Sequence, residues 1–247
     1  MLILAAHPDD AALGVRGWLE EHGSPITLAY LTDGAPRDQR HRAPLATGEY
    51  PARTAYRLTR RQEAAAAWRS YPRARLLFGE AVDQELASRL QHSEAWLHSV
   101  AAQARPRLIL APAFEGGHPD HDAANLLAAR LSRQLQIEAW EYALYSARRG
   151  AIVRQCFPEA PVWSATLPAP VAASKRAALD AFASQHATLA SFSAHREALR
   201  PLPAHDYRHR PCPAPCVYEL WGWPWSGDEI ANLFAAFLDS CHEASVA

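Results

Sequence analysis

The chain has 247 residues, of which 49% are hydrophobic and 21% charged, and its formal net charge is −1. A charge so near zero argues against a nucleic acid held by bulk electrostatics, and no run of about 18 apolar residues is present to span a membrane. This size fits one α/β domain over residues 1–247, which buries enough surface to fold without disulfides or a structural metal.

Apolar runs alternate with helix-compatible segments along most of the chain. We expect strands at residues 2–6, 26–31, 75–78, 107–111 and 137–142, with helices at 11–22, 59–70, 83–104 and 120–134. We further expect a long polar loop at 35–58, one or two strands within 152–167, a helix at 169–186, a strand at 216–221 and a helix at 228–241. This alternation predicts a Rossmann-like three-layer sandwich, in which helices cover both faces of a mostly parallel sheet.

Polar clusters follow the first, second and fourth predicted strands. They are His7–Asp10, Thr32–Asp33 and His118–His121. In a parallel sheet ligands bind at the carboxyl ends of the strands, so three separate segments would bring polar groups to one edge. We therefore expect the active site at that edge.

The first and third of these clusters repeat one design, a strand followed by His-Pro-Asp and then a helix. A capped helix start explains either one alone, because an N-cap needs only one Asp, but it does not explain two at one sheet edge. Catalytic zinc takes three protein ligands and keeps a position open, and His7, Asp10 and either His118 or His121 supply that number. Asp9 and the remaining histidine are then available as general base and general acid.

These segments resemble the PIG-L/LmbE family of zinc-dependent N-deacetylases. The motifs that carry the resemblance are AAHPDDAALG at 5–14, LTDG at 31–34 and GHPDH at 117–121, with weaker matches at Arg60–Ala64, Lys175, Ser184–Gln185 and Tyr218–Glu219. The resemblance implies that His7, Asp10 and His121 bind Zn²⁺ and that Asp9 is the general base. It also implies that His118 is the general acid or stabilises the tetrahedral intermediate, and that the substrate is an N-acetylglucosaminyl compound.

Two positions depart from the family pattern. Ala11 stands where the family usually has Glu, which weakens a supporting contact but removes no metal ligand. Gly116 stands where some members have Tyr, two positions before the catalytic histidine. The oxyanion would then be stabilised by zinc and His118, or by another group.

Four further residues are candidates for the site, each with an alternative. Asp33 either orients a ligand histidine or ends the turn before a glycine. Arg60 and Glu63, one helical turn apart, form an ion pair near the site or lie on a solvated face. Arg53 belongs to the Arg-rich loop, which is either a lid that grips anionic or hydroxyl groups or a polar mobile loop.

The last part of the chain holds two features without an assigned function. The tryptophans at 221, 223 and 225 would stack on a sugar ring or lie in the core or a subunit interface. Cys212 and Cys216 are read as free thiols in a surface turn, with a metal site that includes His205 and His209 as the alternative. Free thiols suit a reducing compartment, and the N-terminus lacks the basic region of a signal peptide, so we expect the cytoplasm.

The sequence therefore predicts a zinc-dependent hydrolase that removes an N-acyl group, in particular acetyl, from an amino sugar or glycoconjugate. Fe²⁺ or another divalent ion suits two histidines and one aspartate equally well. One alternative is a sugar-binding protein that retains the metal without catalysis, against which the free carboxylate of Asp9 argues. Another is a metal-dependent phosphoesterase, which would need more ligands than the strand ends offer. Both a monomer and a homo-oligomer are compatible with the sequence.

Overall fold

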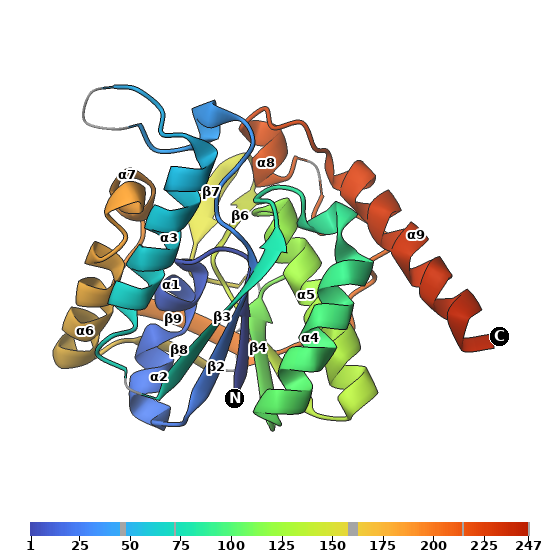
Figure 1. The fold of residues 1–247 in the computed structure, drawn as a ribbon, viewed down its shortest axis with the longest axis horizontal. Coiled ribbons are helices and arrows are strands. Elements are labelled where there is room, and N and C mark those ends of the chain that lie inside the picture. Colours follow the sequence, from blue (N-terminus) through green and yellow to red (C-terminus); the bar gives the residue numbers. More distant parts are fainter. Residues whose placement is uncertain (45–47, 72, 158–162, 214, 247) are drawn as a thin grey trace.

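The computed structural model describes residues 1–44, 48–71, 73–157, 163–213 and 215–246 (Figure 1). Within them, seven strands form one sheet in the order β3-β2-β1-β4-β5-β9-β8. Their bounds are β1 Leu2–Ala5, β2 Ile26–Thr32, β3 Ala74–Ala81, β4 Leu108–Pro112, β5 Glu138–Tyr142, β8 Trp163–Thr166 and β9 Arg196–Pro201. The first five strands in this order are parallel, and β9 and β8 join antiparallel at one edge.

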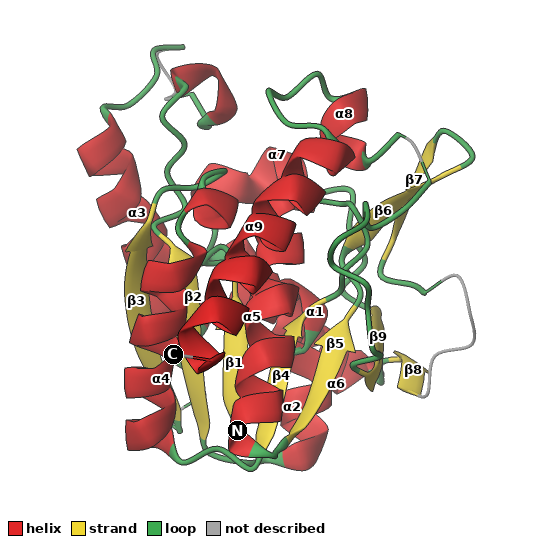
Figure 2. Ribbon diagram, turned by 90° about the vertical axis from the view of Figure 1, so that its right-hand side faces the viewer, coloured by secondary structure: helices red, strands yellow, loops and turns green. Residues whose placement is uncertain are grey.

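Helices cover both faces of this sheet (Figures 1 and 2). One face carries α4 Leu90–Ala104, α5 Pro119–Leu135 and α9 Gly227–Val246, and the other carries α1 Asp10–Gly14, α2 Arg16–His22, α3 Arg53–Ala67 and α6 Ala169–Asp180. The arrangement confirms the predicted α/β sandwich. No helix in the described part of the chain combines the length and the apolar character that crossing a bilayer requires.

The central strand β1 divides the core into its two layers. Leu2 and Leu4 point into the layer under α4 and α5, whereas Ile3 and Ala5 point into the layer under α2 and α3. All four side chains are fully buried, because successive residues of a strand face opposite sides and both sides are covered. Strand β1 pairs in parallel with both β2 and β4, so the loops that follow these strands leave at the same edge.

The structure differs from the predicted elements in several places. The helix expected at 11–22 is two helices, because α1 ends at Gly14 against the ring of Tyr142, where a Cβ would lie 2.2 Å from Tyr142 Cδ2. Helix α3 begins inside the predicted loop, at Arg53. Two strands of the described residues were not predicted: β9, which lies between β5 and β8, and β6 Tyr145–Arg148, the first strand of a hairpin with β7 Ala151–Arg154.

The strand expected at 216–221 is wrong, since this segment is the short helix α8 Val217–Leu220. Its start is fixed by a capping box in which the Glu219 carboxylate accepts the backbone N–H of Cys216 at 2.5 Å. Glu219 also accepts the N–H of Gly227 and a guanidinium N–H of Arg210, so the carboxylate that starts α8 is held by its surroundings.

One buried ion pair ties the antiparallel edge to the helices of one face. Lys175 Nζ lies 2.9 Å from Glu197 Oε1, and both side chains are fully buried. Glu197 also accepts the backbone N–H groups of Gly17 and Trp18 at 2.7 and 2.8 Å. A buried cation that loses its partner is strongly destabilising.

We therefore expect Glu197→Gln to lower the free energy of unfolding by about 3–5 kcal/mol, because it leaves Lys175 buried without a counter-charge. Urea denaturation followed by circular dichroism measures this change. The matched control is Asp239→Asn, which breaks the exposed pair of Asp239 with Arg208 and should leave the free energy of unfolding nearly unchanged. Equal losses in the two variants would contradict the assignment.

Candidate active site

Two neighbouring strands deliver the main side chains of the site. His7 lies just beyond β1, and its backbone N–H donates to Asp10 Oδ2 at 2.8 Å, which turns the chain into α1. His118 lies beyond β4 as the N-cap of α5, with Pro119 at the first helical position, where its missing N–H costs nothing. Because β1 and β4 are paired, the two turns face each other.

The predicted metal ligands His7, Asp10 and His121 come together in one buried group. His121 Nε2 lies 3.1 Å from Asp10 Oδ1 and 3.3 Å from His7 Nδ1, and His7 Nδ1 lies 3.5 Å from Asp10 Oδ2. Burial alone would raise the pKa of Asp10, but His121 and His7 hold it well below its usual range, so the carboxylate is charged. Two ring nitrogens and a charged carboxylate that converge in this way fit a zinc ion or a similar divalent ion.

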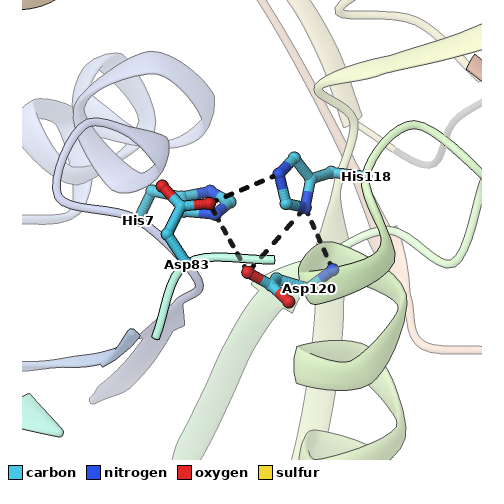
Figure 3. A group of neighbouring side chains, drawn as sticks. All are labelled: His7, Asp83, His118 and Asp120. Atoms are coloured by element: carbon cyan, nitrogen blue, oxygen red, sulfur yellow. Dashed lines mark hydrogen bonds and ion pairs between the residues drawn. The ribbon is translucent and has the colours of Figure 1, made fainter. Parts of the chain in front are cut away.

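A second group of neighbouring side chains lies at the other ring nitrogen of His7, Nε2, and comprises His7, Asp83, His118 and Asp120 (Figure 3). His7 Nε2 is 3.3 Å from Asp120 Oδ2 and 3.3 Å from Asp83 Oδ1. Asp120 is held in place because it accepts the backbone N–H groups of Gln84 and Leu86 at 2.6 and 3.0 Å. A carboxylate on the second nitrogen of a ligand histidine keeps the proton there and leaves Nδ1 free for a metal.

The surroundings of His118 decide which of its ring nitrogens carries a proton. Its Nδ1 accepts the backbone N–H of Asp120 at 3.0 Å, so the proton of the neutral ring lies on Nε2. Burial lowers the pKa of His118 well below its usual value, and His7 and His121 lower it further. The ring is therefore a neutral hydrogen-bond donor, which suits stabilisation of an oxyanion better than general acid catalysis.

The predicted base Asp9 lies beside the ligand group and is 8% exposed. Its Oδ1 accepts a hydrogen bond from Arg60 Nη2 at 2.8 Å. Arg60 is 2% exposed, and its Nη1 lies 3.6 Å from Glu63 Oε2. The Glu63 carboxylate also accepts hydrogen bonds from the backbone N–H and the hydroxyl of Ser184, both at 2.7 Å. The predicted Arg60–Glu63 pair is thus buried next to the site and not on a solvated face.

Asp33 and Arg53 lie apart from the metal ligands. The two side chains form an ion pair with each other, while Asp33 accepts the N–H of Ala35 at 3.0 Å and Arg53 donates to the carbonyl of Ala35 at 2.9 Å. Neither of them lines the cavity over the ligand group. The ring of His7, a predicted metal ligand, contacts Asp120 and not Asp33, and the contacts of Asp33 are with Arg53 and the turn at Ala35.

A cavity of about 390 Å³ opens above the ligands. Its lining includes the polar side chains of Asp83, Gln84 and His41. It also includes four aromatic rings in contact with one another, which form an aromatic wall: Tyr145, Phe192, Trp221 and Trp223. The ring of Trp223 meets that of His118 edge-on at 4.9 Å between centroids, and the ring of Tyr145 meets that of His121 at 5.4 Å. Two of the three predicted sugar-stacking tryptophans thus reach the cavity, while Trp225 donates to the carbonyl of Gln84.

Sequence reasoning missed Asp83 and Tyr145. Asp83 follows β3, which pairs with β2 through an irregular register between Tyr30 and Thr32, and no motif marks it. Tyr145 begins the unpredicted hairpin strand β6. Gly117 allows this approach, because a Cβ on it would lie 2.1 Å from the carbonyl oxygen of Tyr145.

The contacts of Asp120 generate a test of the ligand group. We expect Asp120→Asn to weaken Zn²⁺ binding about 10- to 100-fold, since it removes the charge that holds the proton on His7 Nε2. Competition with a chromogenic chelator measures the affinity. Asp33→Asn is the control and should leave the affinity unchanged, because Asp33 contacts Arg53 and the turn. The opposite ranking of the two variants would return the orienting role to Asp33.

Comparison with known proteins places the chain in a family. The family model described as PIG-L: GlcNAc-PI de-N-acetylase matches residues 2–132, just over half of the chain. The comparison with curated proteins gave no match.

Solved structures with the same fold include the A40926 pseudoaglycone deacetylase Dbv21, with 19% identity, a TM-score of 0.61, and 83% of this chain and 98% of that chain covered. The N,N'-diacetylchitobiose deacetylase from Pyrococcus horikoshii has 18% identity and a TM-score of 0.57, with 82% and 83% covered. The 4-carboxy-2-hydroxymuconate hydratase GalB from Pseudomonas putida KT2440 has 14% identity and a TM-score of 0.52, with 83% and 96% covered. At these identities the likeness concerns the fold, whereas the family match spans His7, Asp9, Asp10 and His121, and the chain belongs to the PIG-L family.

Proposed function

We propose that the chain is a metal-dependent hydrolase that removes an acetyl or similar acyl group from the amide nitrogen of an amino sugar or glycoconjugate. The observation that carries the proposal is the position of Asp9, a buried carboxylate beside a three-ligand metal group at the base of a cavity. Two similar folds are named as deacetylases of a glycopeptide pseudoaglycone and of diacetylchitobiose, which supports the substrate class. The hydratase among the similar folds means that the fold alone does not fix the reaction.

His7, Asp10 and His121 would hold the metal, with zinc as our first choice. A zinc ion held there would act as a Lewis acid that polarises the amide carbonyl and makes water a better nucleophile. The rest of the chemistry belongs to the side chains around it.

Asp9 would take a proton from the attacking water and return it to the departing amine. Arg60 holds one oxygen of this carboxylate, so the second oxygen can face the water. The C–N bond breaks as the nitrogen accepts that proton, which yields a carboxylic acid and the free amine. The Asp9 carboxylate thus serves first as base and then as acid. No second acid is needed, which is consistent with a neutral His118 whose Nδ1 carries no proton.

The developing charge on the carbonyl oxygen needs hydrogen-bond donors. His118 Nε2–H is one, and we assign the hydroxyl of Tyr145 as a second. Within the described residues this hydroxyl has no hydrogen-bond partner, and the ring packs on the ligand His121 at the cavity wall. Tyr145 would fill the role that Gly116 leaves open.

The lining of the cavity suggests how a substrate lies in it. Hydroxyl groups of a sugar would meet Asp83 and Gln84, while an apolar ring face would lie against Trp221 and Trp223. We also propose that residues 1–247 act as one domain. Strands as far apart in the chain as β1 and β9 share one sheet, and Phe234 and Phe237 of α9 pack into the same core as Leu127 of α5.

The first test compares the zinc-loaded protein with its Asp9→Asn variant on a panel of N-acetylglucosamine conjugates. We expect the wild type to release free amine and acetate, and the variant to lose about 10²- to 10⁴-fold in kcat because it lacks the proton acceptor. Zinc content measured on the same samples should be equal. Sugar binding in both proteins without release of amine would instead support a non-catalytic binder.

A second test concerns Tyr145. We expect Tyr145→Phe to lower kcat about 10- to 100-fold while KM changes little, because the donor acts on charge that develops during the reaction. Tyr56→Phe is the control, since the hydroxyl of Tyr56 lines the same cavity but is engaged by Gln185 and by the N–H of Ala43. A rise in KM at constant kcat would identify Tyr145 as a substrate-binding residue only.

A further inference from the structure

The thiols of Cys212 and Cys216 lie in contact with each other, next to the loop at 116–118 that carries His118. Cys212 Sγ is 3.3 Å from Cys216 Sγ, just before α8. Cys216 is fully buried, whereas Cys212 is partly exposed and lines a second cavity of about 1050 Å³. Neither sulfur belongs to a group of three metal ligands among the described residues, so the predicted alternative of a metal site with His205 and His209 has no support here.

The two thiols have different environments. Arg210 Nη2 lies 3.7 Å from Cys216 Sγ, whereas Arg210 Nε donates to the backbone carbonyl of Cys212 at 3.0 Å. The hydrogen bond from Cys212, assisted by that guanidinium, lowers the pKa of Cys216 to about 7. The same shared proton raises the pKa of Cys212. A pair with one accessible thiol and one thiolate-forming thiol beside it is the arrangement that forms disulfides readily.

This pair packs directly against the loop that carries His118. Gly116, with φ +67°, lies so close that a Cβ on it would be 2.7 Å from Cys212 Sγ and 3.0 Å from Cys216 Sγ. The carbonyl of Gly116 accepts the N–H of Val217 at 2.8 Å, and its own N–H donates to Asp122 at 3.1 Å. The thiols, the loop and the start of α5 are therefore one packed unit.

The pair also borders the aromatic wall of the active site. Cys216 is the N-cap of α8, and the chain continues from α8 to Trp221 and Trp223, which line the cavity. Trp223 lies against the ring of His118, so a shift of α8 reaches the active site from a second direction.

We propose that Cys212 and Cys216 form a reversible dithiol–disulfide site whose oxidation displaces the 116–118 loop and lowers activity. The oxidant is a small-molecule disulfide, RSSR, that enters the second cavity. Cys212 passes its proton to the Cys216 thiolate through the hydrogen bond between them, its sulfur bonds to one sulfur of RSSR, and RS⁻ leaves. This RS⁻ takes the proton from Cys216 and departs as RSH. Cys216 Sγ then attacks Cys212 Sγ and displaces the second RS⁻, which takes a proton from water, so that two protein thiols become one disulfide and RSSR becomes two thiols.

The expected displacement follows from bond length. A disulfide joins its sulfurs at about 2.0 Å, so the pair must close by roughly 1 Å from its present separation of 3.3 Å. Gly116 lies beside both sulfurs, so we expect this closure to move it as well. A misplacement of about 1 Å in a catalytic group costs up to about 100-fold in rate, so a loss of activity of roughly 10- to 100-fold is expected.

The chemical test treats the full-length, zinc-loaded protein with glutathione disulfide and then counts thiols in denaturant. We expect two of the four cysteines to disappear, a mass decrease of about 2 Da, and a linked 212–216 peptide, all reversed by dithiothreitol. Cys156→Ser and Cys241→Ser should behave like the wild type, while Cys212→Ser and Cys216→Ser should form no internal disulfide. Four thiols retained, or a stable glutathione adduct on Cys212, would overturn the site.

The coupling to the active site has a readout that does not depend on the reaction. In protein loaded with Co²⁺ instead of zinc, oxidation should change the visible absorption bands, which report the geometry around the metal. The Cys212→Ser variant should show no such change under the same treatment. A disulfide that forms with unchanged Co²⁺ bands and unchanged activity would overturn the coupling. Failure of the proposed deacetylase function would leave the thiol count and the spectrum interpretable.

Discussion

The parallel pairing of β1 with β4 is the constraint on which the site depends. Leu2 lies opposite Ile109 and Ile3 opposite Leu110, so the two strands end side by side at the sheet centre. Every residue of β1 is fully buried between two helical layers. A shift of this register by one residue would move each side chain of the strand to the opposite face of the sheet, so the packing of both layers fixes the register. His7 and Asp10, two of the predicted metal ligands, therefore directly follow a strand whose residues are all fully buried.

The sequence was sufficient to predict what local chemistry encodes. Short apolar runs followed by His-Pro-Asp predicted the strand ends at His7 and His118, and the structure brings His7, Asp10 and His121 into one group. The order of strands and helices was enough for the α/β class, because parallel strands need helical crossovers. The buried pairing of Arg60 with Asp9 was beyond the sequence, since a helix spacing shows which residues share a face but not which face is covered.

The residues that sequence reasoning missed reach the site through long-range contacts. Asp83 follows β3, whose pairing with β2 has an irregular register, and no sequence motif marks it. Tyr145 lies in the hairpin of β6 and β7, whose short strands show no alternation of hydrophobic and polar residues. The error at α8 has the same origin. Aromatic and β-branched residues at 216–221 favour a strand locally, but the capping bonds of Glu219 and its contacts with Arg210 and Gly227 select a helix. Local propensity gave way to tertiary contacts that no window of the sequence contains.

The division of roles along the chain bears on what sets substrate choice. The family match ends at residue 132 and contains the predicted metal ligands, Asp9 and His118, whereas the aromatic wall comes from residues after that point. This later part is joined to the earlier part by many hydrogen bonds, among them the pairing of β5 with β4 and the bonds from Ser184 to Glu63 and from Val217 to Gly116. Its aromatic side chains reach the site by ring packing, with Trp223 on His118 and Tyr145 on His121. The aromatic wall is therefore built on the same frame as the predicted metal ligands, so a change of one of its side chains alters the shape of the cavity and the packing on these two rings together.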